Sequence, residues 1–324
     1  MLSNSSWRNL KAHQAIIQVS SFRVGRFSLP ETSVSLQALL VKVSEALQKA
    51  AVLLEDSSVE SAEVNAQWLM AHVLGCSRSE LALKQAQRLT VKQQIQWDEL
   101  VELRAQRIPL QHLIGTVEFC GLELVVNKHV LVPRPETEIL AEAAWEYVAL
   151  KESAIVLDIG TGSGCLAIAI ASQATSAVVH AIDISREALK VAQANANRHG
   201  LSDCIVFHQV DVRQDCPIGG TADLVVSNPP YIPTGEIETL QEEVSKHDPR
   251  LALDGGEDGL DYFRFLAVNY LPCLGAGGRL MLEVGDGQAP KVSDLICKHG
   301  GQVLEILPDL NNVERIVVAS PINS

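Results

Sequence analysis

The sequence predicts an α/β fold: a mostly parallel sheet covered by helices, preceded by a smaller helical domain. Short apolar runs alternate with helical segments from residue 154 onward, which is typical of parallel strands buried on both faces. The last two runs, 303–307 and 316–318, are joined by a linker too short for a crossover helix, so we expect an antiparallel pair there. Residues 35–107 show helical periodicity instead.

Composition narrows the function classes. The 324 residues suffice for two domains, and the net charge of −13 argues against binding along a nucleic-acid duplex by phosphate neutralisation. The seven cysteines and nine histidines are scattered without metal-ligand spacing. We therefore expect no metal site, and free thiols in a reducing compartment. The longest apolar runs are too short to span a membrane, so no transmembrane helix is expected.

The N-terminal segment differs from the rest of the chain. The first thirty residues contain Arg8, Lys11, Arg23 and Arg26 but no acidic residue, so residues 1–33 are expected to form a basic, flexible leader. An acid-poor leader of this kind is also typical of an organelle transit peptide. We expect a cytoplasmic protein, with the mitochondrial or plastid matrix as the alternative.

Residues 34–110 are expected to form a helical domain. Apolar residues such as Leu36, Leu40 and Val43 recur at three- and four-residue spacing and mark one face of a first helix. Thr90–Gln93 has the spacing of a capping box and opens a later helix. None of these residues indicates catalysis, so the domain is expected to pack on, or dock, a partner.

A hairpin is expected to join the two domains. Residues 111–132 contain short extended pieces with alternating polarity, and a turn is expected at Asn127–Lys128. The α/β domain then covers residues 133–324, and it begins with a helix that follows two closely spaced prolines.

A glycine-rich loop follows the first strand of the α/β domain, in "LDIGTGSGC". Gly160, Gly162 and Gly164 allow positive φ and let a ligand lie against the backbone. A dinucleotide fingerprint would need a glycine at Cys165, so the loop fits that motif poorly. A carboxylate at Asp158 suits a cationic ligand better than a phosphate.

Acidic residues follow the next two strands. Asp183 is placed to accept hydrogen bonds from both hydroxyls of a ribose, although it could also cap the following helix. Asp211 could accept from an adenine amino group, or be a solvated loop acid. Because the carboxyl ends of parallel strands meet at one edge of a sheet, their joint placement favours a ligand site.

The stretch "SNPPYIP" follows an apolar strand at 224–226. Consecutive prolines lack N–H groups and have a fixed φ, so the segment is stiff, extended and short of donors. Its carbonyl groups and the Asn228 amide remain free to bind a ligand. The alternative is a turn that merely ends a strand.

Together these motifs resemble the class I S-adenosylmethionine-dependent methyltransferases, and "NPPY" resembles the subset that methylates planar amide-like or exocyclic nitrogens. The segments "PLQHLIGTVEFCGLEL", "LVPRPETEIL", "DPRLALDGGEDGL" and "LEVG" are similar to the HemK/PrmC-type glutamine methyltransferases of peptide chain release factors. The resemblance covers roughly residues 35–319. It implies a Rossmann-like sheet of seven strands whose last strand is antiparallel.

The resemblance implies methyl transfer from S-adenosylmethionine to the side-chain nitrogen (N5) of glutamine in the Gly-Gly-Gln motif of class I release factors. The helical domain would dock the release factor, and the enzyme would be a monomer without membrane or direct nucleic-acid contacts. One alternative is a DNA or RNA exocyclic-amino methyltransferase. Another is a non-catalytic adaptor that binds S-adenosylmethionine.

The resemblance also implies the site residues. The catalytic residues are those of the NPPY motif: Asn228, Pro229, Pro230 and Tyr231. The cofactor-binding residues lie mainly on the glycine loop and at the strand ends: Asp158, Gly160, Thr161, Gly162, Ser163, Gly164, Asp183, Asp211, Val212, Asn228 and Phe119. The substrate-binding residues are Asn228, Pro229, Pro230, Tyr231, Arg134 and Glu136.

The chemistry explains why "NPPY" suits an amide. A glutamine amide is a poor nucleophile, so the Asn228 oxygen and the Pro229 carbonyl would accept its hydrogens and hold the nitrogen in line with the methyl group. Some assignments keep an alternative from the residues themselves. Phe119 could be a core aromatic, and Arg134 could form a salt bridge at a helix start. Glu283 ends a strand and is either a site residue or a solvated acid.

Overall fold

A seven-stranded sheet forms the centre of the larger domain in the computed structural model. The structure describes residues 40–214, 216–218 and 221–322, so the predicted leader, 1–33, lies outside the described residues. From one edge to the other the strands are β5 (Ile205–Gln209), β4 (Ala177–Asp183), β3 (Ala154–Ile159), β6 (Ala222–Ser227), β7 (Leu274–Glu283), β9 (Glu314–Pro321) and β8 (Gly301–Pro308).

The strand directions confirm the predicted fold class. Strands β5, β4, β3, β6 and β7 pair in parallel, whereas β9 lies antiparallel between β7 and β8. The loop between β8 and β9 is short, as the sequence indicated, so the chain can only turn back on itself there. The carboxyl ends of the parallel strands therefore meet at one edge of the sheet, where the site residues follow.

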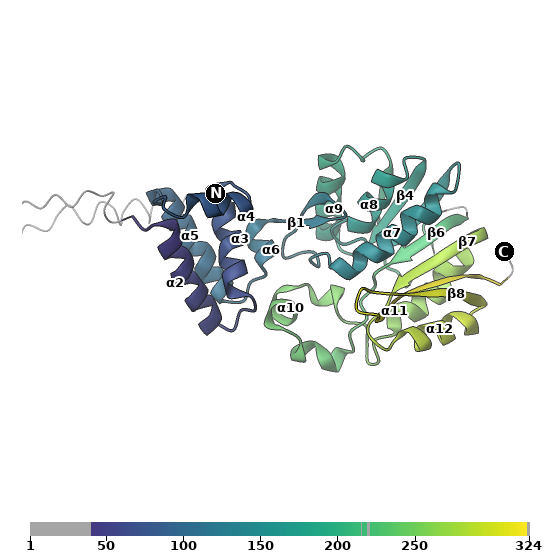
Figure 1. Ribbon diagram of the computed structural model, residues 1–324. Helices are drawn as coiled ribbons and strands as arrows, with labels where there is room; N and C mark the ends of the chain where they lie inside the picture. The colour runs from purple at the N-terminus through teal and green to yellow at the C-terminus, as the bar shows by residue number, and fades with distance from the viewer. Residues whose placement is uncertain (1–39, 215, 219–220, 323–324) are drawn as a thin grey trace, which may run out of the picture. The chain divides into compact units, whose positions relative to one another are not determined.

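Helices cover both faces of the sheet (Figure 1). One face packs against α7 (Pro135–Ala149), α8 (Cys165–Gln173) and α9 (Arg186–Arg198), and the other against α11 (Asp261–Phe265) and α12 (Ala289–Lys298). Val156 and Leu157 are neighbours in β3, both fully buried, and they belong to the cores on opposite faces. This alternation is why the strands are apolar at nearly every position.

The helical domain contains α2 (Val43–Asp56), α3 (Ala62–Leu74), α4 (Arg78–Leu81) and α5 (Val91–Ala105), which share one apolar core. The predicted capping box is confirmed, because the Thr90 hydroxyl accepts from the Gln93 amide and the Gln93 side chain accepts from the Thr90 amide. The first helix that the structure describes starts at Val43, so Leu40 lies before it and not on its apolar face.

A hairpin follows the short helix α6 (Leu110–Ile114), but its turn was predicted at the wrong place. Strands β1 (Thr116–Phe119) and β2 (Leu122–Val125) are joined at Cys120–Gly121, not at Asn127–Lys128. Cys120 has φ 49° and Gly121 has φ 74°. Two consecutive residues with positive φ match the tight turn that the twist of an antiparallel pair requires.

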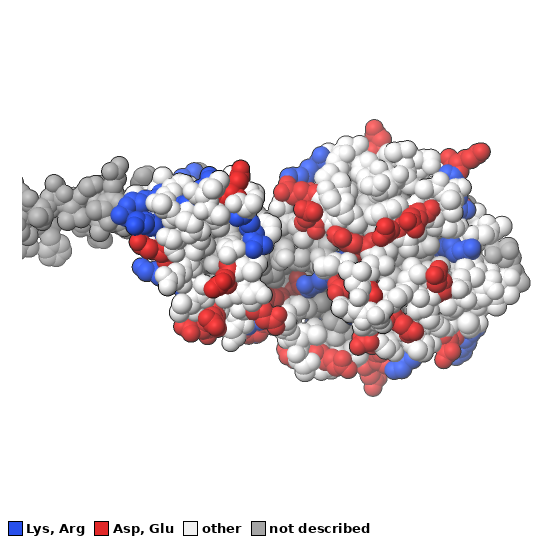
Figure 2. All heavy atoms as spheres, viewed as in Figure 1, with Lys and Arg blue, Asp and Glu red and all other residues white. Residues whose placement is uncertain are grey.

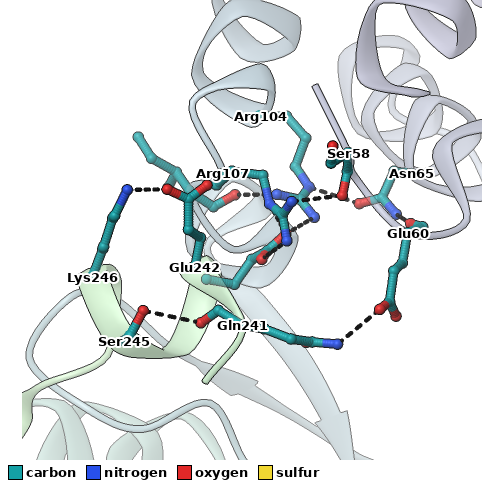
Figure 3. Close-up of polar contacts among 11 residues, drawn as sticks. Ser58, Glu60, Asn65, Arg104, Arg107, Gln241, Glu242, Ser245 and Lys246 are labelled. Carbon is teal, nitrogen blue, oxygen red and sulfur yellow. Dashed lines mark hydrogen bonds and ion pairs between the residues drawn. The ribbon is translucent and has the colours of Figure 1, made fainter. Parts of the chain in front are cut away.

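The chain also contains a polar cluster where the last turn of α5 meets α10 (Glu242–His247), the helix that follows "SNPPYIP" (Figure 3). Arg104 and Arg107 both donate hydrogen bonds to Glu243, and Gln241 donates to Glu60. In the part of the chain that the structure describes, no helix is both long and apolar enough to cross a membrane.

Candidate active site

Six of the eleven predicted cofactor residues line a cavity of about 580 Å³ at the carboxyl edge of the sheet. Gly160 and Gly162 come from the loop after β3, Asp183 from the end of β4, Asp211 from the loop after β5, and Asn228 from the segment after β6. Val212 and Pro230 also line this cavity. Residues from four successive strand ends are therefore gathered around one space, as expected for an open α/β sheet.

Two glycines of the loop have different structural roles: Gly160 leaves space for a ligand, and Gly164 allows close helix packing. Gly160 has φ 74°, and a Cβ built on it would meet no described atom within 4 Å. The backbone of Gly160 is therefore open to a ligand. Gly164 has φ 83°, and a Cβ there would lie 3.1 Å from the Cβ of Ala192 on α9. Gly164 allows α8 and α9 to pack closely and does not line the cavity.

Asp158 lies fully buried beneath the loop. Its Oδ2 accepts hydrogen bonds from the Thr161 hydroxyl at 2.6 Å and from the Ala167 amide at 3.1 Å, which ties the loop to the start of α8. Its Oδ1 has no partner among the described atoms. Burial raises the pKa of Asp158 to about 7. Thr161 and Ser163 are buried too, so they shape the loop rather than the cavity surface.

Asp183 is held in place by two backbone donors. The Gly162 amide donates to Oδ2 at 2.9 Å and the Ser185 amide donates to Oδ1 at 2.8 Å. The cap of α9 is Ser185, whose hydroxyl accepts from the Ala188 amide at 3.2 Å. Asp183 is therefore not the helix cap, and its carboxylate faces the cavity with a fixed orientation. Burial raises its pKa.

Two predicted cofactor residues are engaged by other parts of the protein. Asp211 lines the cavity, but Arg213 donates to both of its oxygens, and this hydrogen bonding lowers the pKa of Asp211. Phe119 is 1% exposed and packs in the core with Leu124 and Leu140. It is among the lining residues of neither described cavity. The structure therefore gives Phe119 the place of a core aromatic.

A second cavity of about 270 Å³ adjoins the first. Asn228 and Pro229 line both cavities, whereas Pro230 faces the larger one and Tyr231 the smaller one. The walls of the smaller cavity include charged residues from distant parts of the chain: Arg134, Glu136, Glu283 and Arg315. The NPPY motif thus forms the boundary between the two spaces.

The NPPY segment is fixed by a glycine-rich turn within the segment "DGGEDG". The Ile232 amide donates to the Leu253 carbonyl at 3.0 Å, and the Gly255 amide donates to the Ile232 carbonyl at 2.9 Å. A Cβ on Gly255 would lie 2.9 Å from the Pro230 carbonyl oxygen. Only glycine lets the turn pack so closely on the prolines, so residues 254–259 support the extended shape of the motif.

Charged residues at the smaller cavity have specific partners. Arg134 precedes α7 and pairs with the buried Asp248 at 2.9 Å, so it links two distant segments rather than forming a local bridge at the helix start. Burial raises the pKa of Asp248 to about 6. Burial also raises the pKa of Tyr231 to about 12, which keeps its phenol neutral.

Sequence reasoning left the role of Glu283 open and missed the buried Thr137, which contacts Asn228. Glu283 is 2% exposed, so it is not a solvated acid. Thr137, in the first turn of α7, is also buried, and its hydroxyl accepts a hydrogen bond from the Asn228 amide at 3.0 Å. Two features of the sequence could have pointed to these residues. One is the acid directly at the end of β7, and the other is the threonine within "PRPETE".

Comparisons with known proteins identify related families and sequences. The family described as PrmC N-terminal domain matches residues 45–115, and the Methyltransferase small domain family matches residues 137–257. A Geobacter sulfurreducens protein named release factor glutamine methyltransferase is 40% identical over 265 residues, which are 82% of this chain and 91% of that protein. A Deinococcus radiodurans protein of the same name is 40% identical over 86% of this chain and 98% of its own length.

Solved structures support the fold. The hMettl16 catalytic domain, crystallised with the MAT2A 3′UTR hairpin 6, aligns with a TM-score of 0.51 over 69% of this chain and 82% of that one. At 14% identity this likeness concerns the fold and not the substrate.

Proposed function

The chain belongs to the release factor glutamine methyltransferase family, and from this premise we propose how its cavities carry out the reaction. The enzyme transfers a methyl group from S-adenosylmethionine to the side-chain nitrogen of glutamine. The proposed substrate is the Gly-Gly-Gln loop of a class I release factor. The observation that carries the proposal is that Asn228 and Pro229 line both cavities, so they face cofactor and substrate together.

The residues around the larger cavity fit the cofactor. Asp183 has a fixed carboxylate that would accept from the ribose hydroxyls, and Gly160 leaves open space beside the backbone. Asp158 does not line the cavity, but its unpartnered Oδ1 lies buried beneath the loop, where a negative charge would favour a cationic ligand. When bound, S-adenosylmethionine supplies an electrophilic methyl group on a sulfonium.

In the smaller cavity the chain's own groups position the amide. The side-chain oxygen of Asn228 and the carbonyl oxygen of Pro229 accept the two hydrogens of the glutamine nitrogen. They hold that nitrogen toward the larger cavity and stabilise the positive charge that develops on it during attack. The neutral phenol ring of Tyr231 covers the flat amide. Arg134 and Glu136 contact the backbone that flanks the glutamine.

A protein substrate is favoured over a nucleic acid. On the visible face of the α/β domain, Asp and Glu side chains are more abundant than Lys and Arg (Figure 2), in line with the net charge of −13. A surface of this charge repels phosphates. The helical domain, most of which lies in the range 45–115 that the PrmC N-terminal domain family matches, is proposed to dock the release factor. We propose a reducing compartment, the cytoplasm or an organelle matrix, from the scattered and odd-numbered cysteines of the sequence.

The test is transfer of a labelled methyl group from S-adenosylmethionine to purified release factor, with DNA and RNA offered in parallel. We expect label on the release factor and none on a Gln→Glu release factor whose Gly-Gly-Gln motif lacks the amide. Label on DNA or RNA but not on the release factor would favour the nucleic-acid alternative. Cofactor binding without transfer to any of them would favour the adaptor.

A further inference from the structure

Glu283 is a buried acid that the proposed mechanism does not use. It ends β7, is 2% exposed and lines the smaller cavity together with Asn228. Its Oε2 atom has no hydrogen-bond partner in the described structure. The nearby guanidinium of Arg315 is engaged elsewhere, since its Nε donates to Asp309 at 3.1 Å. A buried carboxylate that lacks an ion pair destabilises a fold, so a role in stability does not explain it.

The polar neighbours of Glu283 lead directly to the NPPY motif. Burial raises the pKa of Glu283 to about 7, while the neighbouring polar side chains of Thr137 and Asn228 oppose that rise. The Asn228 amide nitrogen also donates to the Thr137 hydroxyl at 3.0 Å. A hydroxyl that accepts one hydrogen bond keeps its own hydrogen to donate, and a carboxylate can only accept. The hydroxyl hydrogen of Thr137 is therefore left to donate, and the carboxylate of Glu283, which lines the smaller cavity with Asn228 and has an unpartnered Oε2, is an acceptor there.

This direction determines which end of the Asn228 side chain faces the substrate. A carboxamide has an oxygen end and a nitrogen end of nearly the same shape, and its neighbours decide which way it points. The Thr137 hydroxyl accepts from the nitrogen end at 3.0 Å, which leaves the oxygen end for the cavities that Asn228 lines. A substrate amide needs an acceptor there, because its nitrogen carries only hydrogens to donate.

We propose that Glu283 is a positioning residue for methyl transfer, which acts with Thr137 to hold the Asn228 carboxamide with its oxygen toward the substrate nitrogen. The proposal rests on the proposed function above and adds two residues to it. Protonated Glu283 would itself be a donor and would no longer favour this orientation.

Ionisation of Glu283 therefore links activity to pH. The charged groups that face it are Glu136 from α7, which raises its pKa, and Arg315 from β9, which lowers it. The active form is the carboxylate, so kcat at saturating cofactor and substrate should rise with pH through about 7.

The test uses isosteric changes in the full-length enzyme. Glu283→Gln can present either end of its own amide, and Thr137→Val removes the hydroxyl without changing its shape. Each should lower kcat by about 10- to 100-fold, the range for a lost hydrogen bond to a charged group, while KM for cofactor and release factor stays nearly constant. Thr137→Ser keeps the hydroxyl, so this variant should retain most of the wild-type activity. Glu305→Gln, the same chemical change at an exposed position of β8, should leave kcat unchanged.

The pH profile gives a second readout. The rise through about pH 7 should be present in wild-type enzyme and absent in Glu283→Gln. A Glu283→Gln enzyme with wild-type kcat and a wild-type pH profile would overturn the proposal while leaving the methyltransferase activity established.

A spectroscopic readout separates this proposal from the proposed function. The side-chain amide of Asn228, identified in NMR spectra by its loss in Asn228→Ala, should titrate with a midpoint near pH 7 in wild type and not in Glu283→Gln. If wild-type enzyme methylates no release factor, the proposed function fails and this titration still decides the role of Glu283. If the Asn228 amide signal titrates in the same way in wild type and in Glu283→Gln, the proposed role of Glu283 is refuted.

Discussion

Arg107 holds Glu243 through two parallel hydrogen bonds, from Nε to Oε1 at 2.8 Å and from Nη2 to Oε2. Arg104 adds a third donor to Oε1 at 2.7 Å. Paired donors of this geometry make strong and directional contacts with a carboxylate. Because Glu243 lies on the helix that follows the NPPY motif, the end of α5 is joined to the segment that leaves the active site.

The first prediction is that Glu243 matters for stability and its neighbour Glu242 does not. Glu243 is 15% exposed in its side chain and Arg104 is 6% exposed, so Glu243→Ala leaves a buried arginine without its partner. We expect a loss of on the order of 3 kcal/mol in unfolding free energy, measured by urea denaturation at pH 7. Glu242 pairs with Lys246 on the surface, and Glu242→Ala should cost less than about 1 kcal/mol. Equal losses would contradict the prediction.

The pH dependence of this effect has a definite sign. Burial raises the pKa of Glu243, but hydrogen bonds from Arg107 and Arg104 outweigh it and leave the pKa below its usual value. The stability contributed by Glu243 is therefore present above the pKa of the unfolded chain and is lost as pH falls through the folded pKa. The difference between wild type and Glu243→Ala should shrink when urea titrations are repeated in strong acid.

The second prediction concerns the ribose contact. Asp183→Ala removes a carboxylate that two backbone amides hold toward the cavity. Binding of S-adenosylmethionine should weaken by about 1.5–3 kcal/mol, measured by calorimetry. Asp203→Ala, which changes an exposed acid in the turn before β5, is the matched control and should bind normally. Unchanged affinity in Asp183→Ala would remove Asp183 from the cofactor site.

The third prediction is that the buried Asp158 lowers the stability of the folded protein at neutral pH and favours binding of the cofactor. The pKa of Asp158 is raised to about 7 in the folded protein, compared with about 3.9 in the unfolded chain. Protonated Asp158 therefore contributes stability that is fully present below about pH 3.9. This contribution is lost as the pH rises through about 7. Asp158→Asn should raise Tm by a few degrees at pH 8 and change it little at pH 5. It should also weaken binding of the cationic cofactor, because an NH₂ group replaces the free oxygen. A lower Tm at pH 8 would count against it.

The fourth prediction concerns Asn228. Asn228→Ala should leave cofactor affinity nearly unchanged but reduce kcat by on the order of 10²–10³, the cost of losing one preorganised polar contact in a transition state. Asn228→Asp keeps the size but cannot donate to Thr137, so it should also be slow. Single-turnover methylation of release factor is the measurement. Near wild-type rates for both variants would show that "SNPPYIP" is only a structural turn without a role in catalysis.

Local patterns explain what the sequence could predict. The positions of Asp183 and Asn228 follow from strand ends, and a strand end is visible as an apolar run that stops at a polar residue. The glycine loop is visible because positive φ restricts the residue type. The antiparallel pair at the end follows from loop length alone.

What the sequence could not predict depends on contacts between distant segments. Glu283 was indistinguishable from a solvated acid, because its burial results from side chains such as Thr137 and Tyr231 that lie far away in the chain. The hairpin turn was misplaced because Asn127–Lys128 has the composition of a turn, whereas Cys120–Gly121 has the required φ values. Asp211 is engaged by Arg213, two residues away, and composition cannot indicate how that arginine is oriented.

The shared wall between the two cavities has a consequence for inhibitor design. Leu131, Asn228, Pro229 and Ala252 line both spaces, so a single compound can carry an adenosyl group in one cavity and a carboxamide in the other. Linking two fragments makes the second binding event intramolecular, and a short linker of matching length corresponds to an effective concentration in the millimolar range. Because the carboxamide arm would bind through the amide acceptors, such a compound should discriminate against methyltransferases that share the cofactor cavity but lack those acceptors.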